Sequence, residues 1–96
     1  MDVVQVTKTD IEYGKPGELN ACPVALAMKA HFNADHVYAD QARLEVVIKG
    51  RSTIYDTPKR VERFMDRFDG HKGVRAFSFE LASPLGHKKA HFQAVC

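Results

Sequence analysis

The chain has 96 residues, of which 45% are hydrophobic and 27% are charged, and its formal net charge is +2. The length and composition exclude a disordered chain and predict a single small domain over residues 1–96, while the charge is too small to indicate a nucleic-acid partner by itself. Two cysteines are too few for a secreted disulfide scaffold, and no segment resembles a signal peptide or reaches the ~20 apolar residues of a membrane span. We therefore expect reduced thiols and no membrane partner.

The first third of the chain is predicted to form a strand and a helix. Residues 3–8 are rich in β-branched side chains, which favour strands, and residues 9–12 fit one helical turn before a loop at 14–17. Asn20 or Ala21 is expected to cap a helix that ends near Phe32, with Pro23 in the first turn, where a missing N–H is tolerated. Because Lys29 is the only charged residue before the helix end, we expect this helix to be buried on most sides.

Three short strands and a second helix are predicted next. The strands cover residues 37–39, 43–49 and 52–56, with a turn at 40–41 and a type II′ hairpin turn at 50–51. Thr57 is expected to cap the second helix, Pro58 to occupy its first position and Gly70 to end it. Its apolar stripe has helical spacing and consists of Val61, Phe64, Met65 and Phe68.

The last part of the chain is predicted to add two strands. Residues 75–81 alternate, with Phe77, Phe79 and Leu81 facing inward, and a turn at 83–86 precedes a weaker strand at 90–95. The predicted order is β-α-β-β-β-α-β-β, which favours a two-layer α+β domain with two helices on one face of a small, mostly antiparallel sheet. The strand at 90–95 offers an open sheet edge, through which we expect a homodimer to form.

Four short blocks follow one another along the chain. They are Ile11-Glu12-Tyr13-Gly14; Cys22-Pro23-Val24-Ala25-Leu26-Ala27; Pro58 with Val61, Phe64, Phe68 and Asp69; and Phe77-Ser78-Phe79-Glu80-Leu81. This order resembles a group of short tailed-phage proteins, and the likeness covers approximately residues 9–81. The resemblance implies a phage origin and expression in the cytoplasm of a bacterial host, and it supplies no catalytic residues.

The start of the first helix has two chemical interpretations. A helix N-terminus attracts anions and lowers the pKa of a thiol, so Cys22 is a candidate nucleophile, although no His-containing motif marks a base for it. The other interpretation is a site for a small phosphorylated ligand or nucleotide at residues 15–23, with Lys15, Gly17, Asn20 and Cys22 as binding residues. The P-loop and dinucleotide-binding motifs are absent. A packed thiol and a plain surface loop are the structural alternatives.

Basic residues predict a partner-binding surface on the second helix. They are Lys59, Arg60, Arg63 and Arg67, and three carboxylates interleave with them in sequence, at Glu62, Asp66 and Asp69. The basic residues suit an acidic protein surface. The carboxylates would repel a nucleic acid, which is therefore a less favoured partner. The alternative interpretation is a solvated helix face without a partner, stabilised by i, i+3 and i, i+4 ion pairs.

No metal site or cofactor is predicted. His87 and His91 have a spacing that binds metals on a helix, but they fall in a predicted loop and strand, where they would not converge. The chain has no Cys-x-x-Cys or His-Glu-x-x-His motif, and no pair of aspartates suggests acid–base catalysis.

These features together predict a phage-encoded, non-enzymatic binding protein that acts in the host cytoplasm and engages or inhibits a host protein, either a defence or a regulatory factor. Binding of a small phosphorylated ligand at residues 15–23 is the alternative function.

Overall fold

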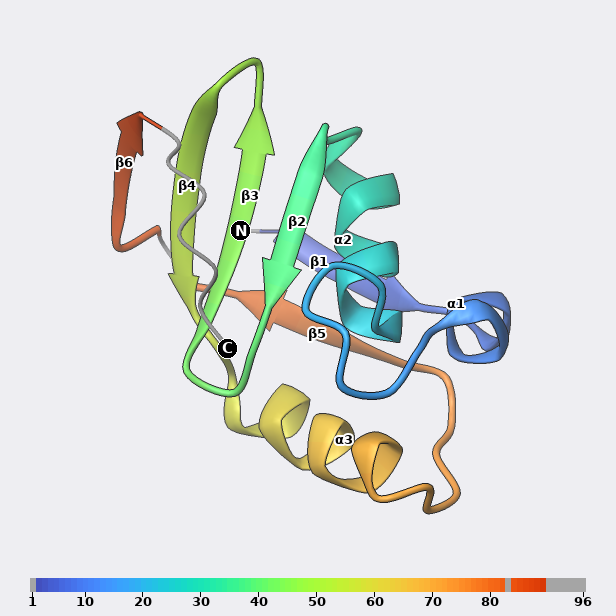
Figure 1. Cartoon of the computed structure of the whole chain (residues 1–96). Helices are drawn as coiled ribbons and strands as arrows, with labels where there is room; N and C mark the ends of the chain where they lie inside the picture. Colours follow the sequence, from blue (N-terminus) through green and yellow to red (C-terminus); the bar gives the residue numbers. More distant parts are fainter. Residues whose placement is uncertain (1, 83, 90–96) are drawn as a thin grey trace.

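The chain adopts an α+β fold in a computed structural model that describes residues 2–82 and 84–89 (Figure 1). Its elements in chain order are β1 (Asp2–Val6), α1 (Lys8–Tyr13), α2 (Pro23–Phe32), β2 (His36–Ala39), β3 (Arg43–Ile48), β4 (Arg51–Asp56), α3 (Lys59–Asp69), β5 (Phe77–Leu81) and β6 (Gly86–Lys89). The predicted α+β class is therefore confirmed, and the predicted helical turn at 9–12 is the centre of α1.

The strands form two antiparallel sheets instead of the single predicted sheet. One sheet pairs β1 with β5, and the other has the order β2-β3-β4-β6. Figure 1 shows β1 and β5 running across the direction of β2, β3 and β4. The prediction failed here because alternating hydrophobicity identifies the buried side of a strand but does not identify the neighbour with which the strand pairs.

The helix α2 forms the centre of the core. It packs against α1, β1, β2 and β3, so that it contacts both sheets, and Val24 and Met28 are fully buried. This agrees with the expectation of a helix buried on most sides. The helix ends where predicted, because Asn33 adopts the left-handed conformation with φ of 52° and its N–H reaches the last turn.

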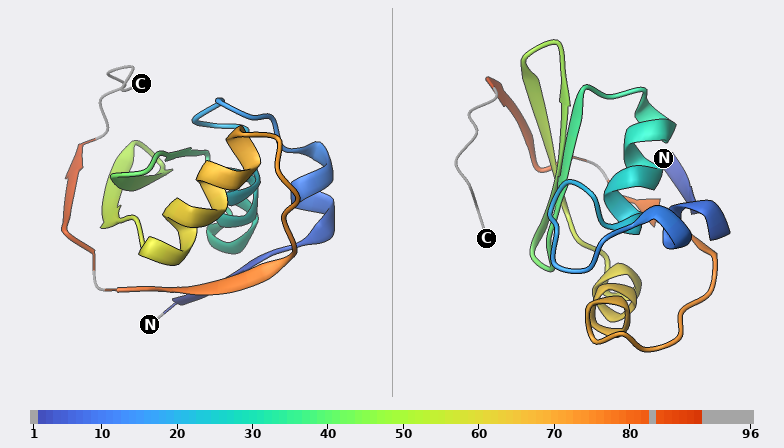
Figure 2. Two further views of the ribbon diagram at one scale, coloured as in Figure 1. Left: turned by 90° about the horizontal axis from the view of Figure 1, so that it is seen from below. Right: turned by 45° about the vertical axis from the view of Figure 1, so that its right-hand side comes forward.

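The helix α3 lies across the ends of β2, β3 and β4, below α2 (Figures 1 and 2). The predicted apolar stripe faces the core: Val61, Phe64 and Met65 are buried. The ring of Phe64 packs against Phe77 of β5, with 4.7 Å between the ring centroids. In this position α3 closes the end of the core that α2 and the two sheets leave open.

Both predicted helix caps were wrong by one or two residues. The N-cap of α2 is Cys22, with Pro23 as the first helical residue, and the N-cap of α3 is Pro58. Thr57 does not cap α3, because its hydroxyl donates to the backbone carbonyl of Asp40 at 2.7 Å. Thr57 therefore fastens the start of α3 to the turn between β2 and β3.

The β3–β4 hairpin turns one residue earlier than predicted. Ile48 pairs with Arg51, so Lys49 and Gly50 form the turn, and their φ angles of 50° and 77° match a type I′ turn. The carboxylate of Asp35 accepts the backbone N–H of Lys49 at 2.7 Å. This bond holds a non-glycine residue in the left-handed conformation.

At the C-terminal end, β6 occupies residues for which no strand was predicted. It pairs with β4 in the four-stranded sheet. The predicted strand at 90–95, and the homodimer interface assigned to it, lie outside the described residues.

Candidate functional site

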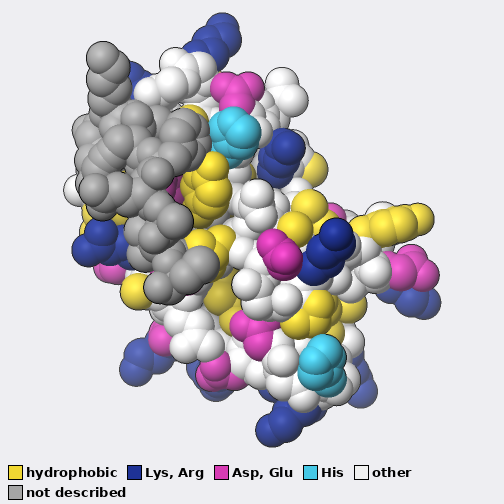
Figure 3. Space-filling view, in the orientation of Figure 1, with side chains coloured by type: hydrophobic (Ala, Val, Ile, Leu, Met, Phe, Trp, Pro, Cys, Tyr) yellow, Lys and Arg dark blue, Asp and Glu magenta, His cyan; other side chains and the backbone are white. Residues whose placement is uncertain are grey.

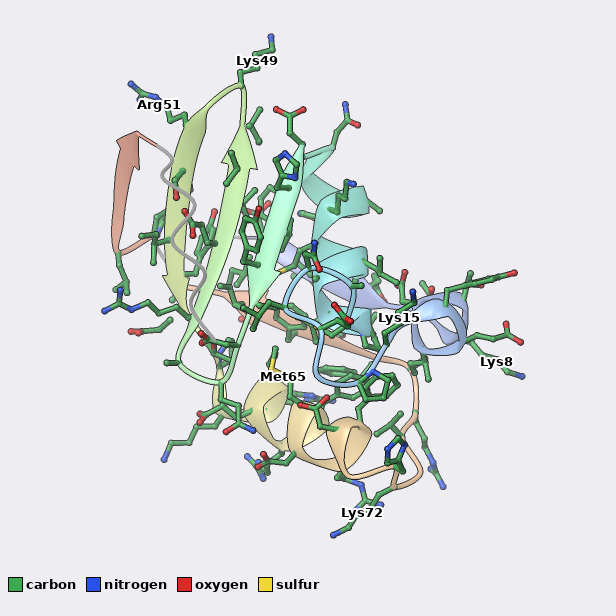
Figure 4. All side chains as sticks on the ribbon, in the orientation of Figure 1. Lys8, Lys15, Lys49, Arg51, Met65 and Lys72 are labelled. Atoms are coloured by element: carbon green, nitrogen blue, oxygen red, sulfur yellow. The ribbon has the colours of Figure 1, made fainter. Side chains whose placement is uncertain are left out.

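A pocket of about 250 Å³ lies where α2, α3 and the end of β2 meet the loop before α2. Its walls are mostly apolar and include Cys22, Pro23 and Val24 of the α2 start together with Phe64, Met65 and Phe68 of α3. Leu19 and Ala39 complete the apolar lining, and the polar lining consists of Gly17, Glu18, Asp40, Gln41 and Asp69. Figure 4 shows Met65 pointing from α3 toward this junction. We call this cavity the α2–α3 pocket.

Three hydrogen bonds hold the loop that forms one side of the pocket, one within the loop and two to other parts of the fold. The N–H of Lys15 donates to the carbonyl of Ala21 at 2.8 Å, which closes the loop on itself. The N–H of Ala39 in β2 donates to the carbonyl of Leu19 at 2.8 Å. The carboxylate of Asp69, at the end of α3, accepts the N–H of Gly17 at 3.1 Å. These bonds hold the loop against β2 and α3, so the pocket is largely preformed.

Cys22 lies in the wall of the pocket, and the residue as a whole is 7% exposed. Burial raises the pKa of the Cys22 thiol, and nearby Asp69 adds to the rise, while the backbone amides of Ala25 and Val24 act in the opposite direction. The thiol is therefore protonated at neutral pH, which disfavours a nucleophilic role. The position of Cys22 agrees with the alternative of a packed thiol.

The residues predicted to bind a phosphorylated ligand do not converge. Gly17 and Cys22 line the pocket, whereas Lys15 and Asn20 are exposed and lie outside its lining. Figure 4 shows Lys15 on the loop between α1 and α2. The first turn of α2 is buried, and its accessible side faces a pocket lined by carboxylates, which repel phosphate. Binding of a phosphorylated ligand therefore stays a prediction, and it could involve only the exposed surface of the loop and not the pocket.

The charged residues of α3 separate onto two flanks of the apolar stripe. At about 100° per residue, the four basic residues span about 100° of the helix circumference and the three carboxylates about 60° on the opposite side of the stripe. The basic face of α3 consists of Lys59, Arg60, Arg63 and Arg67, all of them exposed. The acidic flank consists of Glu62, Asp66 and Asp69. Charges that interleave in sequence are thus segregated in space.

Two carboxylates of the acidic flank are engaged by the loops around the pocket. Asp66 accepts a hydrogen bond from the side chain of Gln41, and Asp69 accepts from Gly17. Among the residues that the structure describes, no ion pair joins two residues of α3, and the pair between His31 and Asp2, at 3.1 Å, involves neither flank of the helix. The predicted alternative of a helix face held by ion pairs therefore does not describe α3.

Two residues of the basic face are oriented by contacts with the fold. The guanidinium of Arg60 lies 5.8 Å from the centroid of the Phe77 ring, a cation–π arrangement. The Nε of Arg67 donates to the carbonyl of Gly73 at 3.1 Å. Figure 3 shows Lys and Arg side chains projecting along the lower edge of the molecule, where α3 lies, and Figure 4 shows Lys72 pointing away from the body just beyond the helix.

Three pocket residues with polar or charged side chains were not predicted from the sequence to lie at a site. Asp40 and Gln41 were assigned only to a turn, and Asp69 was counted only as a surface charge on α3. The sequence did indicate that Asp69 lies at the edge of the core, because it directly follows Phe68 at the end of the apolar stripe. No local signal could have brought Asp69 to the loop at Gly17, because the two residues are 52 positions apart in sequence.

Neither a metal centre nor a membrane-spanning helix is found among the described residues. Among residues 2–82 and 84–89, no three His, Cys, Asp or Glu side chains lie close enough together to hold a metal ion. His87 lies in β6 and His91 outside the described residues, so their pairing stays untested. In the part of the chain that the structure describes, every helix is too short or too polar to cross a bilayer.

Comparison with known proteins gives no assignment: no protein-family model, no curated protein and no solved structure matches this chain.

Proposed function

We propose that this chain is a phage-encoded, non-enzymatic binding protein that acts in the host cytoplasm, where it engages an acidic surface of a host protein through the basic face of α3. The segregation of charge on α3 carries this proposal. Four exposed cations lie together, and within the described residues none of them is paired with a carboxylate. Unpaired surface charge of one sign steers association with a partner of opposite charge.

The dimensions of α3 favour a protein over a nucleic acid as the partner. The helix has 11 residues and is therefore about 16 Å long. Its acidic flank borders the basic face, so a duplex lying along the helix would bring phosphates near Glu62, Asp66 and Asp69. A protein surface avoids this repulsion, because it presents a limited acidic patch to the basic face alone.

The test is capture of a host protein from bacterial lysate by the chain and by two variants of equal net charge. The first variant replaces all four residues of the basic face by Gln. The matched control replaces four exposed basic residues elsewhere, Lys8, Lys29, Arg43 and Arg51, by Gln. Removing four positive charges changes the formal net charge from +2 to −2 in both variants. Thermal unfolding of all three proteins verifies that the fold is retained.

We expect the control to capture the same partner as the wild type and the α3 variant to lose it. With the purified partner, added salt should slow association more than it speeds dissociation. Equal capture by the α3 variant would place the interface elsewhere. Tight binding to random duplex DNA, with a log–log salt slope near −0.9 per phosphate contact, would instead make nucleic acid the partner.

A further inference from the structure

The α2–α3 pocket combines apolar walls with negative charge at its edge. Eight of its lining residues are apolar, and three are carboxylates: Glu18, Asp40 and Asp69. No Lys, Arg or His is among the lining residues. A ligand that fills such a site gains from burying an apolar body and from bringing a positive charge to the edge.

Hydrogen bonds to the protein fix two of these carboxylates and leave one oxygen of each available. The Oδ1 atom of Asp69 accepts from Gly17, and the Oδ1 atom of Asp40 accepts from the N–H groups of Ala42 and Arg43 at 2.7 Å. Within the described residues, the Oδ2 atoms of Asp40 and Asp69 have no protein donor. Each carboxylate is therefore held in place and keeps one oxygen that can accept a hydrogen bond from solvent or from a ligand.

The aromatic and sulfur-containing side chains of α3 suit the same kind of ligand. Phe64 and Phe68 lie parallel, with 6.1 Å between their centroids, and Met65 lines the cavity beside them. Aromatic faces attract organic cations, and the thioether of methionine adapts its shape to apolar groups. The volume of about 250 Å³ is slightly below the range of about 300–1,000 Å³ typical of drug-sized ligands, so the ligand must be small.

We propose that the α2–α3 pocket binds a small organic monocation, an alkyl- or arylalkylammonium compound, with its apolar body against α3 and its ammonium group attracted to the edge of the pocket that carries Glu18, Asp40 and Asp69. This site does not depend on the basic face of α3, which points to the other side of the apolar stripe. A variant with a neutralised basic face should therefore bind the cation as well as the wild type does.

The test uses three probes of similar shape and different charge: 2-phenylethylammonium, 2-phenylethanol and phenylacetate. Binding to the full chain is followed by the amide signals in two-dimensional NMR. We expect the ammonium probe to shift signals of Gly17, Leu19, Gln41 and Phe68, the alcohol to bind more weakly and the carboxylate not to bind. Equal affinities of ammonium and alcohol would overturn the charge selection, and absence of binding or shifts clustered elsewhere would overturn the site.

Two variants and one control test whether the carboxylates of the pocket attract the ammonium probe. Asp69→Asn keeps an oxygen for the N–H of Gly17, and Glu18→Gln changes a side chain outside the hydrogen bonds that anchor the loop. Each should weaken binding of the ammonium probe by about two- to fivefold, as expected for one partly exposed charge, and leave binding of the alcohol unchanged. Glu62→Gln is the matched control, since it removes a carboxylate of α3 that does not line the pocket. An equal loss in the control would mean that net charge, and not the pocket, attracts the probe.

Discussion

Gly14 links α1 to α2 in a way that a single methyl group should disrupt. A Cβ atom at Gly14 would lie 2.5 Å from both Cδ and Cγ of Pro23 and 2.8 Å from its nitrogen, whereas carbon atoms in ordinary contact are about 3.5–4.0 Å apart. Pro23 is fully buried as the first residue of α2, so it cannot move aside into solvent. The φ and ψ angles of Gly14, −69° and 149°, are accessible to alanine, so this glycine is required for space and not for its backbone conformation.

We expect Gly14→Ala to destabilise the fold by about 1–2 kcal/mol. The clash costs about 1–3 kcal/mol, as overpacking of a core does, and the reduced entropy of the unfolded chain returns about 0.4–1 kcal/mol. For a domain of this size the melting temperature should fall by about 5–15 °C, measured by circular dichroism together with urea denaturation. Gly73→Ala is the matched control, because a Cβ there meets nothing within 4 Å. Equal stability of the two variants would refute the proposed contact.

Two further changes test the α2 start and the anchor of α3. Burial raises the pKa of the Cys22 thiol above its ordinary value of 9.0, so on raising the pH the unfolded chain loses the thiol proton before the folded chain does. The folded state therefore keeps its full stability with respect to this thiol below about pH 9, and the free energy of unfolding declines as the pH rises toward the folded-state pKa. We expect Cys22→Ala, made in a Cys96→Ser background, to reduce the slope with which the free energy of unfolding falls above pH 9, by up to about 1.4 kcal/mol per pH unit. Urea denaturation at a series of pH values measures this slope, and equal slopes with and without Cys22 would contradict the burial of this thiol. Thr57→Val removes the donor to the carbonyl of Asp40 and should lower the free energy of unfolding by about 1–2 kcal/mol. Thr57→Ser keeps the hydroxyl and should retain most of the stability. An equal loss in both variants would assign the effect to packing of the methyl group.

Local patterns in the sequence predicted the elements better than their assembly. The stripe of Val61, Phe64 and Met65 identified the buried side of α3 correctly, because helical periodicity depends only on residues a few positions apart. Thr57 was assigned to a cap for the same local reason, since threonine before a proline commonly begins a helix. In the structure, the carbonyl of Asp40, 17 positions earlier, competes successfully for that hydroxyl. Tertiary hydrogen bonds of this kind have no local signature.

The pocket could not be predicted for a related reason. Its walls come from the two helices that the sequence identified, but its shape depends on how the loop before α2 attaches to β2 and α3. The loop composition of glycine, proline and lysine indicated only a turn. The bond between Ala39 and Leu19 and the bond between Gly17 and Asp69 each join segments distant in sequence, and together they convert that turn into one side of a cavity.

The contacts that build the pocket also engage two of the three carboxylates of α3. Asp66 lies next to Arg67 in the sequence and Asp69 two residues after it, and these carboxylates accept hydrogen bonds from Gln41 and Gly17 on the pocket side of the helix. The oxygen atoms that accept these hydrogen bonds are occupied by the loops around the pocket and not by a cation of the basic face. The two proposals thus arise from one arrangement of α3, yet they fail separately: neutralising the basic face leaves every pocket-lining residue in place, and Asp69→Asn leaves every cation of the basic face in place.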